Sequence, residues 1–159
     1  MSELERLGVI IDISHLSDEG FQDVAKFTHK PFLASHSNSR TLCPHPRNLT
    51  DDMLRLLAKR GGIVGMNFYF NFLDSDLARL TERGTAEAVV DHIEHMKKVA
   101  GLDIVALGSD FDGIDQTLDL KDASKMGILV SVMEKRGFTP SEIEKVFSLN
   151  AMRFFKEVL

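Results

Sequence analysis

The sequence contains 159 residues, of which 43% are hydrophobic and 27% are charged, a balance that is ordinary for a soluble globular domain. Its net charge of −5 argues against nucleic acids or acidic membranes as partners, because those ligands select clustered Lys and Arg. The single cysteine, Cys43, excludes an intrachain disulfide and is consistent with a reducing compartment. The charged N-terminus has neither a cleavable leader pattern nor a run long enough to cross a membrane, so we expect a cytoplasmic protein.

The first third of the chain predicts two strands, one helix and a long loop. Residues 8–14 are a nearly continuous apolar run, which is typical of a parallel strand buried on both faces. Ser17 is a good N-cap for a helix over 18–28. A second strand is expected over 32–36, and residues 37–49, which contain two prolines, predict a loop.

The middle of the chain repeats this alternation. Thr50 is expected to cap a helix over 51–60. Residues 63–68 predict the third strand, and the segment 69–83 after it is expected to be a loop with room for a helical turn. Apolar residues at helical spacing predict a further helix over 86–99.

The last third predicts a fourth strand over 104–109 and then helices only. A helix is expected over 122–136, Thr139 opens a capping box with proline at the first helical position, and Asn150 is expected to begin or kink the final helix. The whole pattern predicts an α/β fold with four β-loop-α units and closing helices, and therefore a parallel sheet. Four such units could form a small open sheet or half of an eight-stranded barrel.

Three of the strand-like runs end in residues that carry chemistry. The first ends at His15, the second at His36 and the fourth at Asp110. Because the C-terminal ends of parallel strands meet at one rim, these side chains predict a metal and acid/base site. The alternative for each histidine is an ordinary hydrogen bond at a strand end, but the shared position in consecutive units favours metal ligands.

The rim loops contain further candidates for binding a substrate. Arg47 could clamp a carboxylate with two parallel hydrogen bonds, although its spacing alone favours an ordinary solvated arginine. Asn67 and Tyr69 are candidates for lining the pocket, and Asp112 is a candidate for turning the loop after the fourth strand.

Other histidines give weaker signals. His45 beside Cys43 resembles a metal pair, but the neighbouring prolines and the lone thiol weaken that interpretation. His92 and His95 share one helix face without the zinc-protease spacing, so a surface or packing role is expected. No glycine-rich phosphate loop or serine nucleophile elbow occurs in the sequence.

Several motifs, in order along essentially the whole chain, resemble the membrane (renal) dipeptidase family, the M19 zinc peptidases. They are Ile-Asp-Ile-Ser-His (11–15), Ala-Ser-His-Ser (34–37), His-Pro-Arg-Asn-Leu (45–49) and Gly-Ser-Asp-Phe-Asp-Gly (108–113). The resemblance implies a (β/α)8 barrel that hydrolyses dipeptides with two zinc ions. It implies that His15 and His36 bind the second zinc, that Arg47 binds the substrate carboxylate, and that Asp110 handles protons on the reacting amide.

The resemblance is to the C-terminal half of that barrel only. The family's His-x-Asp pair, bridging glutamate and substrate histidine would lie upstream of Met1. We therefore expect residues 1–159 to be a single partial-barrel domain, well short of the roughly 250 residues of a complete barrel.

Three functions remain open at this point. The first is zinc-dependent hydrolysis of dipeptides by metal-activated water, in company with a missing N-terminal half. The second is a non-catalytic remnant or assembly module that associates through open sheet edges, and the third is a different amidohydrolase-like or phosphoesterase half-barrel. Open edges also predict a homodimer or a complex with the missing half.

Overall fold

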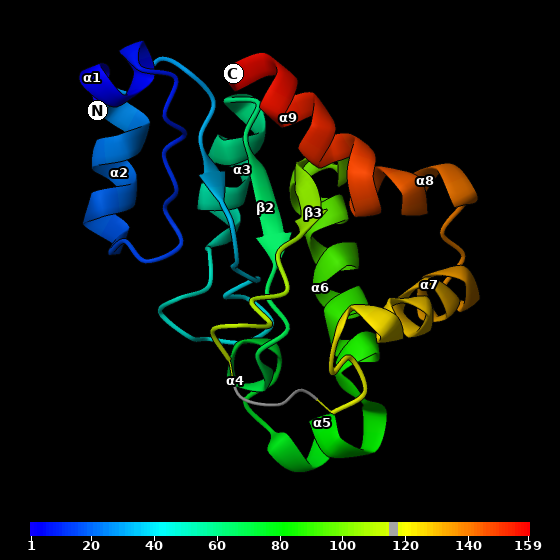
Figure 1. Ribbon diagram of the computed structural model, residues 1–159. Coiled ribbons are helices and arrows are strands. Elements are labelled where there is room, and N and C mark those ends of the chain that lie inside the picture. Colours follow the sequence, from blue (N-terminus) through cyan, green and yellow to red (C-terminus); the bar gives the residue numbers. More distant parts are fainter. Residues whose placement is uncertain (115–117) are drawn as a thin grey trace.

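The computed structural model describes residues 1–114 and 118–159 as an α/β fold around a parallel sheet (Figure 1). The strands are β1 (Leu33–Ala34), β2 (Ile63–Met66) and β3 (Val105–Leu107). The helices are α1 (Ser2–Arg6), α2 (Asp18–Phe27), α3 (Asp51–Lys59), α4 (Phe70–Leu73), α5 (Leu77–Arg83), α6 (Thr85–Ala100), α7 (Met126–Lys135), α8 (Pro140–Glu144) and α9 (Asn150–Val158). Short 3₁₀-helices span Leu102–Ile104 and Ala123–Lys125, and a π-helix spans Lys145–Leu149.

The strands are parallel and lie in the order β1-β2-β3, with Leu33 opposite Ile63 and Val64 opposite Val105. Their C-terminal ends face the side of the molecule that carries α4 and α5, whereas α1 and both termini lie at the opposite end (Figure 1). Among the helices that the structure describes, none is long and apolar enough to span a membrane.

The strand predicted over 8–14 is wrong, because this segment pairs with β1 only through a single bridge between Asp12 and Leu33. The reason is local. The Asp12 carboxylate accepts the backbone N–H of Ser35 at 3.0 Å, an amide that a longer ladder would have paired with a backbone carbonyl. The carbonyl of Ile13 instead accepts the N–H of Leu16 at 3.0 Å, which turns the chain away from the sheet.

The other predicted elements occur close to their expected positions. Ser17, Thr50 and Thr139 each accept a backbone N–H at the start of their helices, and Thr139 with Glu142 completes the capping box. The strands are shorter than predicted, and the segment 69–83 is more helical, since it contains α4 and α5. The final helix changes from π to α geometry at Asn150.

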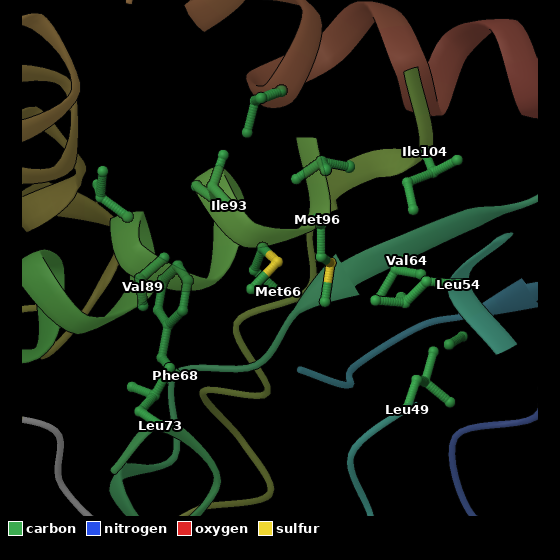
Figure 2. Close-up of a cluster of buried hydrophobic side chains, with 14 of the residues drawn as sticks. Leu49, Leu54, Val64, Met66, Phe68, Leu73, Val89, Ile93, Met96 and Ile104 are labelled. Atoms are coloured by element: carbon green, nitrogen blue, oxygen red, sulfur yellow. The ribbon is translucent and has the colours of Figure 1, made fainter. Parts of the chain in front are cut away.

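The sheet is covered by apolar residues on both faces. On one face, Val64 and Met66 of β2 pack in a large buried cluster with side chains of α3 and α6, including Leu54 and Met96 (Figure 2). Burial of each such side chain stabilises the fold by about 1.5–3 kcal/mol.

The second face is closed by α9. A separate buried cluster joins Leu33, Ile63 and Ala106 of the three strands to Phe154 and Val158 of α9. The cluster gathers residues from the first positions of β1 and β2, so α9 seals the sheet near its N-terminal ends (Figure 1).

Two glycines allow the chain after β1 to cross close to its neighbours. A Cβ at Gly65 would lie 2.0 Å from the carbonyl oxygen of Ser35, and one at Gly108 would lie 1.8 Å from the same atom. No side chain fits at that distance, so both positions require glycine for β1 to deliver His36 to the rim.

Candidate functional site

The two predicted histidines meet at the C-terminal end of the sheet. His15 follows the segment bridged to β1, His36 follows β1 itself, and their Nε2 atoms lie 2.9 Å apart. The backbone N–H of His36 donates to Ser14 Oγ at 2.9 Å, which ties the two segments together. A contact of this length between two ring nitrogens is favourable only with a proton or a cation between them.

The other ring nitrogen of His36 is held by a chain of hydrogen bonds. Nδ1 of His36 lies 2.6 Å from Ser35 Oγ, and this hydroxyl is in turn hydrogen-bonded to Oδ2 of Asp12. Oδ1 of Asp12 accepts the backbone N–H groups of Ser14 and Ser35, both at 3.0 Å.

These contacts shift two pKa values downward. Burial alone would raise the pKa of Asp12, but the hydrogen bonds from Ser35 and Ser14 outweigh it and lower the pKa. Burial lowers the pKa of His36, with the charges of Asp110 and Asp12 opposing that shift. At neutral pH the site therefore contains an ionised carboxylate and a neutral imidazole. Asp12 has no predicted role from the sequence, although a carboxylate inside an apolar run is a signal that could have identified it.

Asp110 lies in the loop that follows β3 and has a left-handed backbone conformation, with φ of 63°. Aspartate tolerates this conformation better than most residues, and the turn is closed by a hydrogen bond from the Gly113 N–H to the Asp110 carbonyl at 2.9 Å. The carboxylate accepts a hydrogen bond from Asn67 Nδ2 at 3.1 Å. Asn67 therefore holds the carboxylate from one side.

A network of fully buried asparagines supports Asp110. Asn67 is enclosed, because its Oδ1 accepts the Tyr69 N–H at 2.6 Å while its Nδ2 donates to Asp110. Asn38 holds the backbone of Asn67 at both its N–H and its carbonyl, at 3.1 and 2.9 Å. Asn48 donates to the carbonyls of Cys43 and Phe72 at 2.9 and 2.8 Å.

Asn67 is predicted from the sequence as a pocket-lining residue, whereas no sequence pattern indicates Asn38 or Asn48. The structure directs the Asn67 amide at Asp110, while Tyr69 lines the cavity itself.

A cavity of about 520 Å³ collects most of the predicted site residues. It is lined by His15, Arg47, Tyr69, Phe72, Asp110, Asp112, Gly113 and Ile114. A second cavity of about 450 Å³ is lined by Ser35, His36 and residues 107–112. Asp110 and Asp112 line both cavities, so each borders the space beside His15 and the space beside His36.

Arg47 is held in place on one side of the larger cavity. Its Nε donates to the Ser14 carbonyl at 2.7 Å, and its guanidinium carbon lies 5.5 Å from the centre of the Phe72 ring. Its Nη2 atom is buried and has no hydrogen-bond partner among residues 1–114 and 118–159. A buried guanidinium nitrogen without a partner is costly, and an anionic ligand would relieve that cost.

The remaining histidines have structural contacts. His92 is buried, accepts the Ser39 N–H at Nδ1 (3.0 Å) and contacts the Leu73 carbonyl through Nε2 (2.9 Å), which confirms its expected packing role. Burial lowers the pKa of His92 to about 4, so it is neutral at physiological pH. His95 contacts Asp51 at 2.8 Å.

Cys43 and His45 each have a contact within the protein that explains their position without a metal. The Cys43 thiol is buried against the Asn71 carbonyl at 3.3 Å, and burial raises its pKa. The His45 ring packs against Phe72, with ring centres 4.5 Å apart.

The residues present fit part of a metal site. The Nε2 atoms of His15 and His36 converge, and neutral imidazoles are common zinc ligands. Over the described part of the chain, no group of three or more His, Cys, Asp or Glu residues is placed to hold a metal ion. A catalytic zinc normally has three protein ligands, so any metal here would need ligands beyond this pair.

Comparison with known proteins places these features in a family. The family model "Membrane dipeptidase (Peptidase family M19)" matches residues 1–159, and the chain belongs to this family of metallopeptidases. An uncharacterized dipeptidase of Schizosaccharomyces pombe is 40% identical over 98% of this chain, and dipeptidase tcpJ of Claviceps purpurea is 36% identical over the same share. The chain spans only 37% and 36% of these two relatives.

A solved structure supports the same conclusion for the fold. A metallopeptidase from Rhodobacter sphaeroides, liganded with a phosphinate mimic of the dipeptide L-Ala-D-Ala, matches 99% of this chain with a TM-score of 0.92 and 34% identity. The match covers 45% of that protein. Membership of a metallopeptidase family implies a metal cofactor. It also argues against the alternative of a phosphoesterase-type barrel.

Proposed function

We propose that this chain forms the C-terminal half of a (β/α)8 barrel and that the completed barrel hydrolyses dipeptides in a zinc-dependent reaction. The observation that carries the proposal is the shared cavity, which His15, Arg47 and Asp110 line together. An imidazole that can bind a metal, a guanidinium and a carboxylate around one space are the groups that hydrolysis of a short peptide with a free carboxylate requires.

Arg47 is proposed to bind the C-terminal carboxylate of the substrate. Its guanidinium is already oriented by the Ser14 carbonyl and by the Phe72 ring, and its Nη2 atom has no partner in the described part of the chain. Preorganisation of this kind lowers the entropy cost of binding. A cavity of about 520 Å³ is in the range of small-molecule sites, and a dipeptide is a ligand of that class.

His15 and His36 are proposed to hold one zinc ion, with the remaining ligands supplied by the rest of the barrel. When bound, zinc lowers the pKa of a bound water and polarises the scissile carbonyl. The chain's own contribution is to keep the two Nε2 atoms converged before the metal arrives.

Asp110 is proposed to handle protons on the reacting amide. Asn67 donates to one of its oxygens, which fixes the carboxylate and leaves the other oxygen for a proton. Asp110 lines the cavities of both histidines, which supports a role for its carboxylate beside the proposed metal and substrate.

Completion of the barrel is proposed to occur along β3. This strand pairs with β2 on one side only in the described part of the chain, and an open edge of this kind favours pairing with another segment. The partner is proposed to be an N-terminal half-barrel of this family, with a homodimer as the alternative. A non-catalytic remnant that associates through this edge remains the second candidate function.

The test is to join the chain to the upstream part of a longer relative and to measure amino acids released from dipeptides with zinc present. We expect zinc-dependent hydrolysis, which Asp110→Asn should reduce in kcat without loss of bound metal. Arg47→Ala should mainly raise KM, and the effect should be smaller for C-terminally amidated dipeptides.

Arg55→Ala is the control, because Arg55 is an exposed arginine of α3 that pairs with Asp52 at 2.8 Å and is absent from the cavity lining. Equal losses on free and amidated substrates would remove Arg47 from the carboxylate role. A completed, zinc-loaded barrel without activity would favour the remnant.

A further inference from the structure

We infer that Asp12 and Ser35 form a positioning pair that fixes the proton of His36 on Nδ1 and leaves the Nε2 lone pair facing His15. Asp12 lines neither of the two cavities that its neighbours define, so it acts through His36 rather than on a substrate. The inference deepens the metal-binding role proposed for His36 and rests on it for its purpose.

The direction of each hydrogen bond follows from the donors that each group possesses. An ionised carboxylate only accepts, so the contact at Asp12 Oδ2 uses the single hydroxyl proton of Ser35. The Ser35 oxygen then has no proton for His36, and the 2.6 Å contact requires Nδ1 of the ring to donate. A neutral imidazole carries one N–H, so Nε2 is left as an acceptor.

The pair is itself fixed by the backbone. Oδ1 of Asp12 accepts two N–H groups, from Ser14 and Ser35, so the carboxylate cannot rotate without losing both. The same two segments are joined by the His36 N–H, which donates to Ser14 Oγ. The ring is therefore oriented from its Nδ1 side, while its Nε2 side faces Nε2 of His15.

The substitution Asp12→Asn should reverse the direction of the hydrogen bonds from residue 12 through Ser35 to His36, because it replaces a carboxylate with an amide of the same shape. In Asp12→Asn, the side-chain oxygen would stay on the two backbone N–H groups, which places Nδ2 against the Ser35 hydroxyl. Nδ2 donates, so Ser35 Oγ accepts from it and turns its own proton toward Nδ1 of His36. The ring proton then moves to Nε2, which removes the lone pair that a metal needs.

The experiment is a long-range ¹H–¹⁵N correlation spectrum of the metal-free 159-residue chain at about pH 8, where histidine is neutral. The signals of the His36 ring are assigned by their absence from the spectrum of His36→Gln. In the wild type, the proton of this ring should be on Nδ1, and in Asp12→Asn it should be on Nε2. In Ser35→Ala, the ring should lose its preference for Nδ1. Asp103→Asn, which alters a carboxylate paired with Lys145 on the surface, is the matched control and should retain the wild-type pattern.

Zinc titration supplies the second measurement, and Asp12→Asn should weaken zinc binding by about 10-fold or more. Wild-type His36 protonated on Nε2, or an unchanged ring in both Asp12→Asn and Ser35→Ala, would overturn the inference. If Asp12→Asn does not fold, the His36 protonation pattern in Ser35→Ala tests the inference, because that variant keeps the carboxylate and its backbone contacts. The expected tautomer in a completed barrel without peptidase activity would count against the proposed function and support the inference.

Discussion

The two ends of the sheet are stabilised by opposite kinds of chemistry. At the C-terminal ends, side-chain carboxylates, amides and hydroxyls such as those of Asp12 and Asn38 take the hydrogen bonds that the short strands do not make. At the N-terminal ends, Phe154 and Val158 of α9 cover the sheet by apolar packing. The difference indicates that stability and site geometry are separable. Changes in α9 should alter stability alone, and changes at the rim should alter both.

The largest effect is expected at the apolar end. Phe154→Ala should lower the free energy of unfolding by about 4 kcal/mol, because it removes a fully buried aromatic ring and leaves a cavity. Phe155→Ala is the matched control, since that ring is 40% exposed, and it should cost less than about 1 kcal/mol. Urea unfolding measures both, and the protonation pattern of His36 should be unchanged. Equal costs for the two rings would contradict the packing of α9.

A pH effect should appear at the polar end. His92 has a pKa of about 4 in the folded protein, against about 6.5 when unfolded, so between these values the unfolded state binds a proton that the folded state excludes. Stability should therefore be complete above about pH 6.5 and should fall by up to about 3 kcal/mol as the pH drops toward 4.

Urea midpoints from about pH 8 to pH 4 test this expectation. His92→Gln should flatten the profile in the window between the two pKa values, whereas His29→Gln, at an exposed position, should not change it. An unchanged slope in His92→Gln would assign the pH dependence to other groups.

A smaller loss, of about 2 kcal/mol, is expected from Asn38→Ala, which leaves the buried N–H and carbonyl of Asn67 without their partners. Since Asn67 holds Asp110, the variant should also reduce kcat in the completed barrel. Asn71→Ala, an exposed asparagine of α4, should change the free energy of unfolding by less than about 0.5 kcal/mol. A stable Asn38→Ala with full activity would show that the rim does not depend on this network.

The smallest effect concerns the start of α6. The carboxylate of Asp119 accepts the N–H groups of Thr85 and Ala86 at 2.6 and 3.2 Å, so a distant residue caps this helix. Asp119→Ala should lower the free energy of unfolding by about 1 kcal/mol. Asp122→Ala, which removes a cap from a three-residue 3₁₀-helix only, should cost less. Indistinguishable melting curves for Asp119→Ala and the wild type would argue against this cap.

Local signals explain which parts of the fold could be predicted from the sequence. Ser17, Thr50 and Thr139 cap their helices through residues three positions away, so short patterns were enough. The prediction of a strand over 8–14 is wrong because the hydrogen bond between the Ser35 N–H and Asp12 ends the pairing with β1. That contact joins residues that are distant in the sequence. The cap of α6 by Asp119 could not be predicted either, because Asp119 is distant in the sequence from the helix that it caps.

The candidate site divides in the same way. The proximity of His15, His36 and Asp110 could be predicted from the sequence, because residues that follow neighbouring parallel strands lie at one rim of the sheet. The hydrogen-bond partners of Asn38 and Asn48 could not be predicted, since these partners are backbone atoms of loops whose conformation has no local sequence signal.

The seal formed by α9 has a consequence for how the protein is made. Leu33 and Ile63 belong to strands that are synthesised early, whereas Phe154 and Val158, which cover them, are synthesised much later. At translation rates of about 5–20 residues per second, this apolar face of the nascent sheet stays uncovered for seconds. Such a face is a binding site for chaperones, and the yield of folded protein should therefore depend on their supply.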